Sequence, residues 1–290
     1  MTTIAELRAA LDAARAGGAV VGLVPTMGYL HDGHESLMDR ARSECDVVVA
    51  TIFVNPLQFG AGEDLDAYPR DLAGDTARAE RAGVDWLFTP TVAEMYPEPV
   101  LTTVSVAGVS AGMEGASRPT HFDGVATVVA KLFNIAGACR AYFGEKDFQQ
   151  LAVVRRMAAD LSMPVEVIGC PTQRESDGLA RSSRNVYLTE EERAAAPVLH
   201  RALSLGAAMI AGGETDADVV RAAMAAEIAT QPLGTLDYVE VADSSTLAPQ
   251  QRCDAGSRLL GAVRFGKARL IDNVGVGIVA GPTAGGTSNE

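Results

Sequence analysis

Residues 19–54, AVVGLVPTMGYLHDGHESLMDRARSECDVVVATIFV, change from a strand pattern to a helix pattern and back, and this change decides the fold class. The apolar run at 19–25 predicts a buried strand, and residues 33–45 have the apolar spacing of an amphipathic helix. Residues 46–54 are β-branched and apolar on both faces, which is typical of a second buried strand. This order predicts two parallel strands joined by a helical crossover.

The same alternation continues to about residue 170. The further predicted elements are strands at 84–90, 101–106, 138–144 and 164–170, and helices at 71–82, 122–136 and 147–161. Apolar strands separated by helices predict an α/β fold, a Rossmann-like, doubly wound parallel sheet that is covered on both faces.

After residue 172 the composition changes. Residues 176–188 are polar, and a capping box formed by Thr189 and Glu192 predicts the start of a helix. The predicted elements are helices at 190–211 and 216–230, and strands at 236–243, 257–266 and 268–279. We therefore predict a first domain at 1–172 and a smaller α+β domain at 173–290, with a disordered tail at 281–290.

Composition limits the function classes. The net charge of −13 argues against a nucleic-acid partner, whereas a small anionic substrate needs only a local basic pocket. The four cysteines are widely spaced without a CxxC pair, so we expect reduced core thiols in a cytoplasmic protein. Thr3 and Glu6 form a capping box before a helix, which does not fit a signal peptide, and we expect no membrane span.

Polar segments follow three of the predicted strands. They are PTMGYLHDGH at 25–34, NPLQF at 55–59 and GEKDFQQ at 144–150. Because the carboxyl ends of parallel strands meet at one edge of a sheet, where ligands bind in doubly wound folds, we expect these segments to form the functional site.

His31 and His34 have three candidate explanations. They are a folding detail at a helix start, two zinc ligands, or donors to a phosphate. No nearby Cys or His completes a zinc set. In the phosphate explanation Gly28 and Gly33 let the backbone approach a ligand, and the helix N-terminus supplies free N–H groups.

Three further motifs each have a functional and an ordinary explanation. In GEKD, Lys146 is a phosphate ligand, or it is solvated while Asp147 caps a helix. SSRN at 182–185 binds oxyanions, or it is a polar loop before a helix. Gln58 orients a polar substrate, or it satisfies loop backbone, and either Gln149 or Gln150 faces the same edge.

Together the segments PTMGYLHDGH, FVNPLQF, DLDAYPR, RPTHFDGV, FGEKDFQQ and DGLARSSRN, across residues 24–188, resemble the pantothenate synthetase (pantoate–β-alanine ligase) family. HxGH alone indicates only the wider nucleotidylyltransferase superfamily. The resemblance implies a homodimeric ATP-dependent enzyme that joins pantoate to β-alanine through a pantoyl adenylate, with Mg²⁺ accompanying ATP.

The resemblance also implies residue roles. The catalytic residues are His34, His31 and Lys146. The ATP-binding residues are Pro25, Met27, Gly28, His31, Gly33, His34, Gly144, Glu145, Lys146, Asp147, Gln173, Arg181, Ser182, Ser183 and Arg184. The pantoate and β-alanine residues are Gln58 and Gln150, with weaker support from Asn55, Tyr68, Arg118 and His121.

Three positions depart from the family pattern. Arg181 and Gln173 stand where apolar residues are usual, and the region after YPR is less acidic, leaving Asp75 as the single metal candidate. The role of His34 stays open between proton transfer and a hydrogen bond. Loop 55–70 is expected to be a lid over the adenylate, or else a passive surface loop.

Two other function classes compete with the ligase. Another HxGH nucleotidylyltransferase would leave AMP on its product, and a non-enzymatic module would bind ATP without turnover.

Overall fold

The computed structural model describes residues 1–60, 62–63 and 65–277, and the chain divides into two compact units, Met1–Tyr187 and Leu188–Glu290. The predicted boundary at residue 172 is wrong, because residues 173–187 pack with the first unit. The predicted disordered tail, 281–290, lies outside the described residues.

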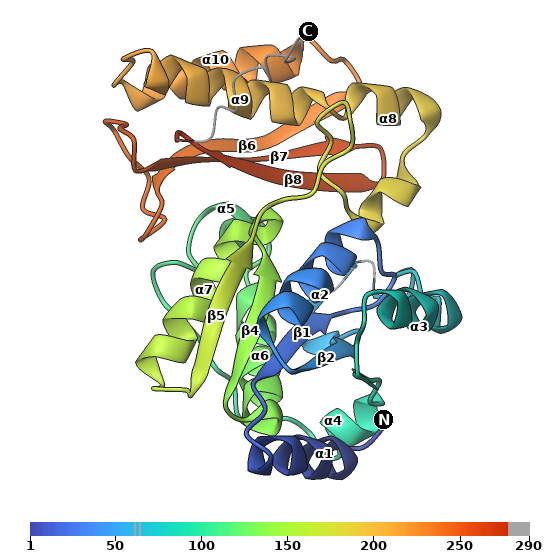
Figure 1. Ribbon diagram of the computed structural model, residues 1–290. Helices are drawn as coiled ribbons and strands as arrows, with labels where there is room; N and C mark the ends of the chain where they lie inside the picture. The colour runs from blue at the N-terminus through green and yellow to red at the C-terminus, as the bar shows by residue number, and fades with distance from the viewer. Residues whose placement is uncertain (61, 64, 278–290) are drawn as a thin grey trace, which may run out of the picture. The chain divides into compact units, whose positions relative to one another are not determined.

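A five-stranded parallel sheet forms the centre of the first unit (Figure 1). Its strands are β1 Val21–Thr26, β2 Val47–Ile52, β3 Trp86–Phe88, β4 Cys139–Gly144 and β5 Val165–Cys170. Their spatial order is β3-β2-β1-β4-β5, and every pairing is parallel. The chain builds outward from β1 in one direction and then from β4 in the other, so the topological switch point lies between these two strands. The predicted doubly wound sheet is confirmed.

Helices cover both faces of this sheet. They are α1 Ile4–Ala16, α2 Asp32–Glu44, α3 Leu72–Arg81, α4 Val92–Met95, α5 Met113–Ser117, α6 His121–Ala136 and α7 Phe148–Asp160, with 3₁₀ turns η1 Pro56–Gln58, η2 Glu145–Asp147 and η3 Ser183–Tyr187. The capping box predicted at Thr3 and Glu6 opens α1, as expected.

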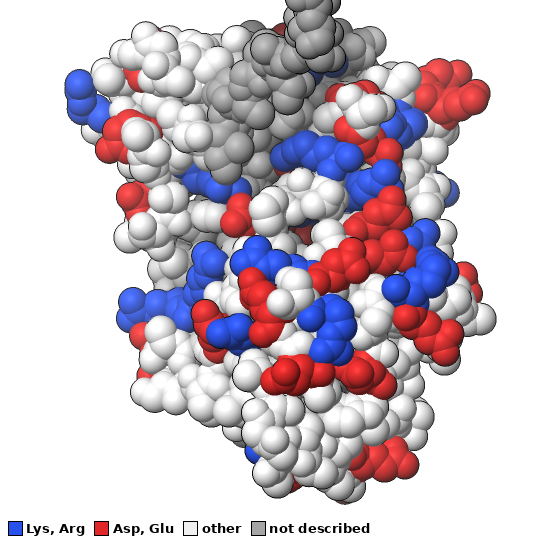
Figure 2. Space-filling model, viewed as in Figure 1, with Lys and Arg blue, Asp and Glu red and all other residues white. Residues whose placement is uncertain are grey.

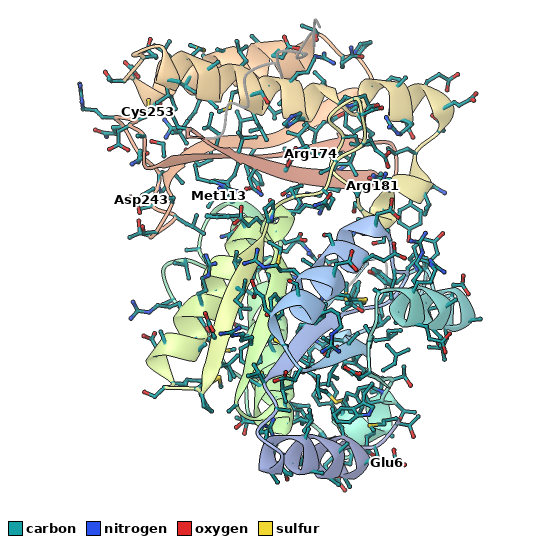
Figure 3. The ribbon with its side chains drawn as sticks, viewed as in Figure 1. Glu6, Met113, Arg174, Arg181, Asp243 and Cys253 are labelled. Atoms are coloured by element: carbon teal, nitrogen blue, oxygen red, sulfur yellow. The ribbon has the colours of Figure 1, made fainter. Side chains whose placement is uncertain are left out.

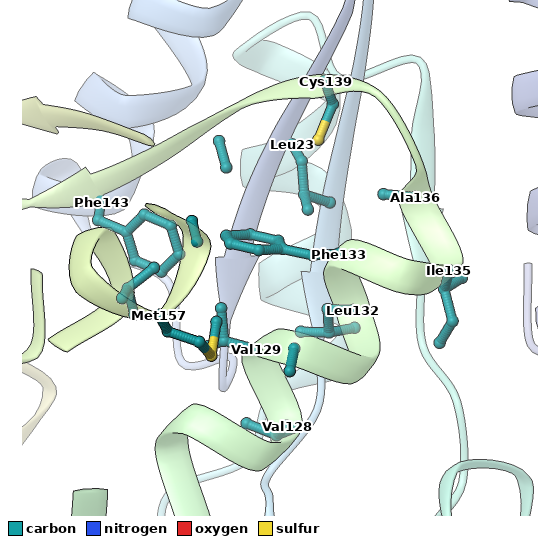
Figure 4. Close-up of a cluster of buried hydrophobic side chains, with 14 of the residues drawn as sticks. Leu23, Val128, Val129, Leu132, Phe133, Ile135, Ala136, Cys139, Phe143 and Met157 are labelled. Carbon is teal, nitrogen blue, oxygen red and sulfur yellow. The ribbon is translucent and has the colours of Figure 1, made fainter. Parts of the chain in front are cut away.

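Alternate residues of the strands pack in two separate hydrophobic cores, one on each face of the sheet. Leu23 and Phe143 pack with α1, α6 and α7, where Phe133 and Met157 surround them (Figure 4). The side chain that follows Leu23 in β1 points to the opposite face of the sheet, where Val24 packs with α2 and α3. This period of two is why the strands read as apolar on both faces in the sequence.

The strand predicted at 101–106 is wrong, since these residues form no strand in the structure. Leu101 is 96% exposed, and the N–H of Val104 donates to the Thr127 hydroxyl rather than to a neighbouring strand. The alternating pattern is present, but residues 101–106 take part in none of the strand pairings of the described chain.

The second unit is an antiparallel sheet with helices, as predicted. Its strands are β6 Gly234–Asp243, β7 Ser257–Phe265 and β8 Ala268–Gly275, and its helices are α8 Glu190–Ala195, α9 Val198–Ala211 and α10 Ala217–Ala229. The single helix predicted at 190–211 is divided at Pro197, which lacks the N–H that continues a helix. The Thr189–Glu192 capping box opens α8.

Among the described residues, the stretch Glu190–Ala211 has the length and apolar composition to cross a membrane. More than half of it is buried within the second unit, as in the core helix of a folded domain, so it is weak evidence for a span. All four cysteines are buried and free, as expected.

Candidate functional site

The turn between β1 and α2 is held by a buried carboxylate. Asp75 on α3 is 3% exposed, and its two oxygens accept the backbone N–H groups of Tyr29 at 2.9 Å and Leu30 at 2.6 Å. Gly28 and Tyr29 have φ angles of +85° and +51°, so the chain turns sharply here. A Cβ on Gly28 would lie 2.9 Å from the Asp75 carboxylate. The glycine therefore makes room for a protein side chain, which the sequence reasoning did not foresee.

The two histidines stand at the start of α2 as neutral donors. The Nδ1 atom of His31 accepts the N–H of Gly33 at 3.1 Å, and the Nδ1 atom of His34 accepts the N–H of His31 at 3.3 Å. The rings lie 4.1 Å apart between centroids. Since each Nδ1 is an acceptor, the ring proton of each neutral imidazole is on Nε2. A Cβ on Gly33 would lie 2.8 Å from the His31 ring, which explains this glycine.

Burial and nearby positive charge keep both imidazoles neutral. Burial, followed by the Lys146 ammonium, lowers the pKa of His31 to about 4. Burial, followed by the neighbouring His31 and then Lys146, lowers the pKa of His34 well below its ordinary value. A protonated imidazole would be desolvated and would face a cation. The site therefore offers two N–H donors rather than two acids at neutral pH.

Lys146 follows β4, on the other side of the switch point from the histidines. Its ammonium is largely buried and lies 3.5 Å from the Asp147 carboxylate. Asp147 precedes α7, but its side chain makes no capping hydrogen bond. The simple capping explanation of GEKD is therefore not supported, and a buried cation stands beside two neutral donors.

The segment 173–187 packs against the same edge. The Tyr68 and Ser183 hydroxyls lie 3.4 Å apart, and the N–H of Arg184 donates to the Ser182 hydroxyl at 3.3 Å. The predicted polar loop at 182–185 includes the start of η3. Ser182, Ser183 and Arg184 thus lie on a short turn rather than on an extended loop.

Arg181 pairs with acidic groups (labelled in Figure 3). Its guanidinium contacts Asp32 in the first turn of α2, and it lies 3.3 Å from Glu175. Its backbone N–H donates to the carbonyl of Gln173, whose side chain is exposed. These contacts give Arg181 a structural partner in the turn that carries the histidines. These contacts do not test whether Arg181 or Gln173 binds ATP, so both assignments stay predictions.

Asp32 also pairs with the neighbouring helix α3. Arg78 lies 3.2 Å from Asp32 and 2.9 Å from Glu35, and Arg81 lies 3.1 Å from Glu35. Figure 2 shows basic and acidic side chains interspersed over the visible face rather than gathered in a basic stripe. The surface therefore lacks the electrostatic pattern of a nucleic-acid site on that face.

Gln58 ends η1 at the carboxyl end of β2. It is 7% exposed, and its Nε2 lies 3.0 Å from the Met27 sulfur in the first loop. The backbone carbonyl of Gln58 accepts a hydrogen bond from His121 Nδ1 at 3.0 Å and another from the Arg118 guanidinium at 3.4 Å. Arg118 also makes a bidentate pair with Glu63, at 2.7 and 2.6 Å. Burial, with Arg118, lowers the pKa of His121 to about 4.

The structure separates the two adjacent glutamines. Gln149 is 3% exposed, and its amide donates to the carbonyls of residues 109, 111 and 112 while accepting the N–H of Glu114. Gln150 is partly exposed, and its side-chain amide makes no hydrogen bond within the described part of the chain. Gln149 is thus a scaffold residue, and the ligand assignment of Gln150 stays a prediction.

The fit to a metal ion is poor. Across residues 1–60, 62–63 and 65–277, no group of three or more His, Cys, Asp or Glu side chains could hold one. Asp75, the predicted metal ligand, already uses both oxygens on backbone N–H groups. No cluster of three ligands therefore forms around His31 and His34 within the described residues, and Mg²⁺ at Asp75 stays a prediction.

Three of the predicted segments thus follow β1, β2 and β4 at the carboxyl edge of the first sheet, and the ligand roles of their residues stay predictions. Pro25 lies in β1 and pairs with Thr51 of β2, and Gly144 ends β4 opposite Cys170. Two contributions were missed, the anchoring carboxylate of Asp75 and the scaffold amide of Gln149. Neither has a local sequence signal, because their partners lie tens of residues away.

Comparisons with known proteins agree with this arrangement. The family model for pantoate-beta-alanine ligase matches residues 1–275. The chain is 56% identical over 274 residues to the pantothenate synthetase of Sinorhizobium medicae, covering 94% of each chain. It is 54% identical over 274 residues to that of Moorella thermoacetica, covering 94% of this chain and 97% of the other.

Solved structures give the same result. The pantothenate synthetase of Thermus thermophilus has a TM-score of 0.90 and 53% identity, covering 95% of this chain and 98% of the other. The pantoate-beta-alanine ligase of Francisella tularensis, complexed with beta-gamma ATP and beta-alanine, has a TM-score of 0.78 and 32% identity, covering 96% and 97%. With the fold, the HxGH turn and these matches in agreement, the chain belongs to the pantoate–β-alanine ligase family.

Proposed function

We propose that this enzyme uses ATP to join (R)-pantoate to β-alanine, giving pantothenate, AMP and diphosphate through a pantoyl adenylate. Family membership supports the overall reaction. The observation that carries the chemistry is the pair of neutral imidazoles, His31 and His34, whose Nδ1 atoms are occupied by backbone N–H groups. Their Nε2–H groups are left as donors beside the cation of Lys146.

The first step needs charge stabilisation. A pantoate carboxylate oxygen attacks the α-phosphorus of ATP, the bond to the bridging oxygen breaks, and diphosphate leaves with the electron pair. Negative charge grows on the leaving oxygens, and preorganised donors there lower the barrier. We assign this role to the Nε2–H groups of His31 and His34, to Lys146, and to the N-terminus of α2. Ser182, Ser183 and Arg184 would complete the set from η3.

This assignment gives His34 a hydrogen-bonding role. A general acid works best when its pKa is close to the working pH. Burial and neighbouring charge lower the pKa of His34 well below its ordinary value. Imidazolium is therefore scarce at neutral pH, and we propose that His34 donates a hydrogen bond without transferring its proton.

The acid substrate is assigned to the neighbouring glutamines. Gln58 and Gln150 present amides after β2 and β4. In the second step the neutral β-alanine amine attacks the acyl carbon, the acyl–phosphate bond breaks, AMP leaves, and the amine nitrogen releases one proton to water. We place pantoate between these amides, with Asn55, Tyr68, Arg118 and His121 supporting this side, and Gly144, Glu145 and Asp147 beside the nucleotide.

Closure of loop 55–70 over the adenylate, with Glu63 held by Arg118, would exclude water. Less cleavage of this loop by protease when ATP and pantoate are present would support the lid, and equal cleavage would contradict it. Mg²⁺ stays a prediction, and an ion that accompanies ATP would take most of its ligands from phosphate and water oxygens. The cytoplasmic location and the homodimer stay predictions, and sedimentation velocity would check the latter.

The adenylate is tested by exchange of labelled diphosphate into ATP without β-alanine. We expect exchange only when pantoate is present, and hydroxylamine should then trap pantoyl hydroxamate. Formation of ADP, or exchange without pantoate, would contradict the proposal. A product that retains AMP after β-alanine is added would indicate a different nucleotidylyltransferase, and ATP binding without turnover would indicate a binding module.

A further inference from the structure

Asn55 lies after β2, directly before η1, and all four hydrogen-bonding positions of its side-chain amide have a partner. It is 1% exposed. Its Oδ1 accepts the N–H of Leu57 at 3.3 Å and the hydroxyl of Tyr96 at 2.9 Å. Its Nδ2 donates to the carbonyl of Gly124 at 3.1 Å and to Oε1 of Gln58 at 3.2 Å. A backbone N–H can only donate and a carbonyl can only accept, so these partners settle which end of the amide is oxygen.

This orientation passes to Gln58. Because Asn55 presents an N–H to Gln58, the atom of Gln58 that faces Asn55 must be its oxygen. The Nε2 of Gln58 then points the other way, toward the Met27 sulfur in the HxGH loop. The backbone of Gln58 is held independently by His121 and Arg118. Gln58 therefore presents its N–H donors on the side away from Asn55.

Tyr96 begins this chain of hydrogen bonds. It follows α4, and its ring packs beside Phe53 with centroids 5.9 Å apart. Burial raises the pKa of its hydroxyl to about 12, so the hydroxyl stays protonated across the working pH range. The hydrogen bond that its hydroxyl donates is the shortest of the four that Asn55 makes.

We propose that Tyr96 is a positioning residue: together with the Leu57 N–H and the Gly124 carbonyl it holds the Asn55 amide, which keeps the Gln58 N–H groups toward the acid substrate. The site then selects an acid that places a hydrogen-bond acceptor, a carboxylate or hydroxyl oxygen, against Gln58. This inference rests on the proposed function of the site. It assigns a direction to the Gln58 contact, which the presence of a glutamine in a motif does not provide.

The first test is Tyr96→Phe, which keeps the ring and its contact with Phe53 but removes the hydroxyl. The matched control is Tyr142→Phe, since the Tyr142 hydroxyl is also buried and donates to Glu44 at 2.9 Å, at the far end of α2. We expect Tyr96→Phe to raise KM for pantoate about three- to tenfold, the scale of one lost hydrogen bond, while KM for ATP changes less than about twofold. The control should change neither constant selectively.

The second test compares Gln58→Glu with Gln58→Ala. Gln58→Glu keeps an oxygen for Asn55 but replaces the donor with another acceptor. We expect it to weaken pantoate binding more than Gln58→Ala, measured by pantoate titration in the exchange assay. Better binding by Gln58→Glu than by Gln58→Ala would mean that Gln58 accepts from the substrate, and would overturn the inference.

The outcomes also separate this inference from the proposed function. Absence of pantoate-dependent exchange in the unaltered enzyme would refute the proposed function itself. Normal exchange, with KM for pantoate and KM for ATP rising together in Tyr96→Phe, would show a purely structural tyrosine and would overturn the positioning role alone. An unchanged KM for pantoate in Tyr96→Phe would do the same.

Discussion

Acidification from pH 7.5 to 5.0 should destabilise the first unit through His31, and His31→Asn should remove that part of the loss. Burial holds the pKa of His31 at about 4 in the folded protein, whereas an unfolded histidine titrates near about 6.5. A histidine whose folded pKa is lowered contributes stability above the unfolded pKa. That contribution is lost as the pH falls from about 6.5 toward about 4, because the unfolded chain binds the proton first.

The size of the effect follows from these two pKa values. At pH 7.5 the histidine is neutral in both states, so almost no stability has yet been lost to protonation of the unfolded chain. At pH 5.0 this protonation amounts to a loss of about 2 kcal/mol in the free energy of unfolding. Asparagine is a suitable replacement because it is neutral at both pH values. Its side-chain oxygen can still accept the Gly33 N–H at the N-cap of α2.

The assay is urea unfolding followed by tryptophan fluorescence. Trp86 is the single tryptophan of the chain and lies in β3, so its signal reports the first unit. The free energy of unfolding is compared between the unaltered protein and His31→Asn at each pH, so that effects of other titrating groups cancel in the difference. We expect the two proteins to converge by about 2 kcal/mol on acidification. Parallel pH dependences would refute the burial argument for His31.

Three other substitutions test separate features. Gly28→Ala would force a Cβ to within 2.9 Å of the Asp75 carboxylate at a φ of +85°, so urea unfolding should show a loss of at least about 1–2 kcal/mol. Lys146→Ala should slow pantoate-dependent exchange by on the order of 10²-fold, the scale of one lost charge-stabilising donor, and a normal rate would remove Lys146 from the adenylation step. Arg181→Met removes the part-exposed pairing with Asp32 and should change the free energy of unfolding by less than about 1 kcal/mol, whereas a larger loss in urea unfolding would show a buried rather than a screened pair.

Most of the secondary structure followed from local pattern. Strand and helix periodicity, capping boxes and the order of elements depend on neighbours within a few residues, and these predictions held for both sheets. Failures occurred where a distant partner decided the outcome. Residues 101–106 alternate like a strand but pair with no described strand, and residues 173–187 belong to the first unit through contacts such as Tyr68 with Ser183.

The candidate site also has features that follow from local sequence and features that depend on distant partners. The motifs predicted which segments meet at the carboxyl edge of the sheet, because the fold class fixes where parallel strands end. They could not assign Asp75 to the β1–α2 turn, since it binds the N–H groups of Tyr29 and Leu30 across 46 and 45 positions of the chain. Reasoning from the residues alone left Gln149 and Gln150 open, and only the family resemblance assigned the ligand to Gln150. The structure adds that backbone groups hold the Gln149 side chain.

The sequence by itself determined the fold class, the order of the strands along the chain, the family resemblance and the set of polar residues at one edge. Only the tertiary structure decided which nitrogen of each imidazole carries the proton, which way the Gln58 amide points, and which acids Arg181 meets. The reason is physical. Periodicity is encoded over a few neighbouring residues, whereas the direction of a buried hydrogen bond is set by donors and acceptors that folding brings from distant parts of the chain.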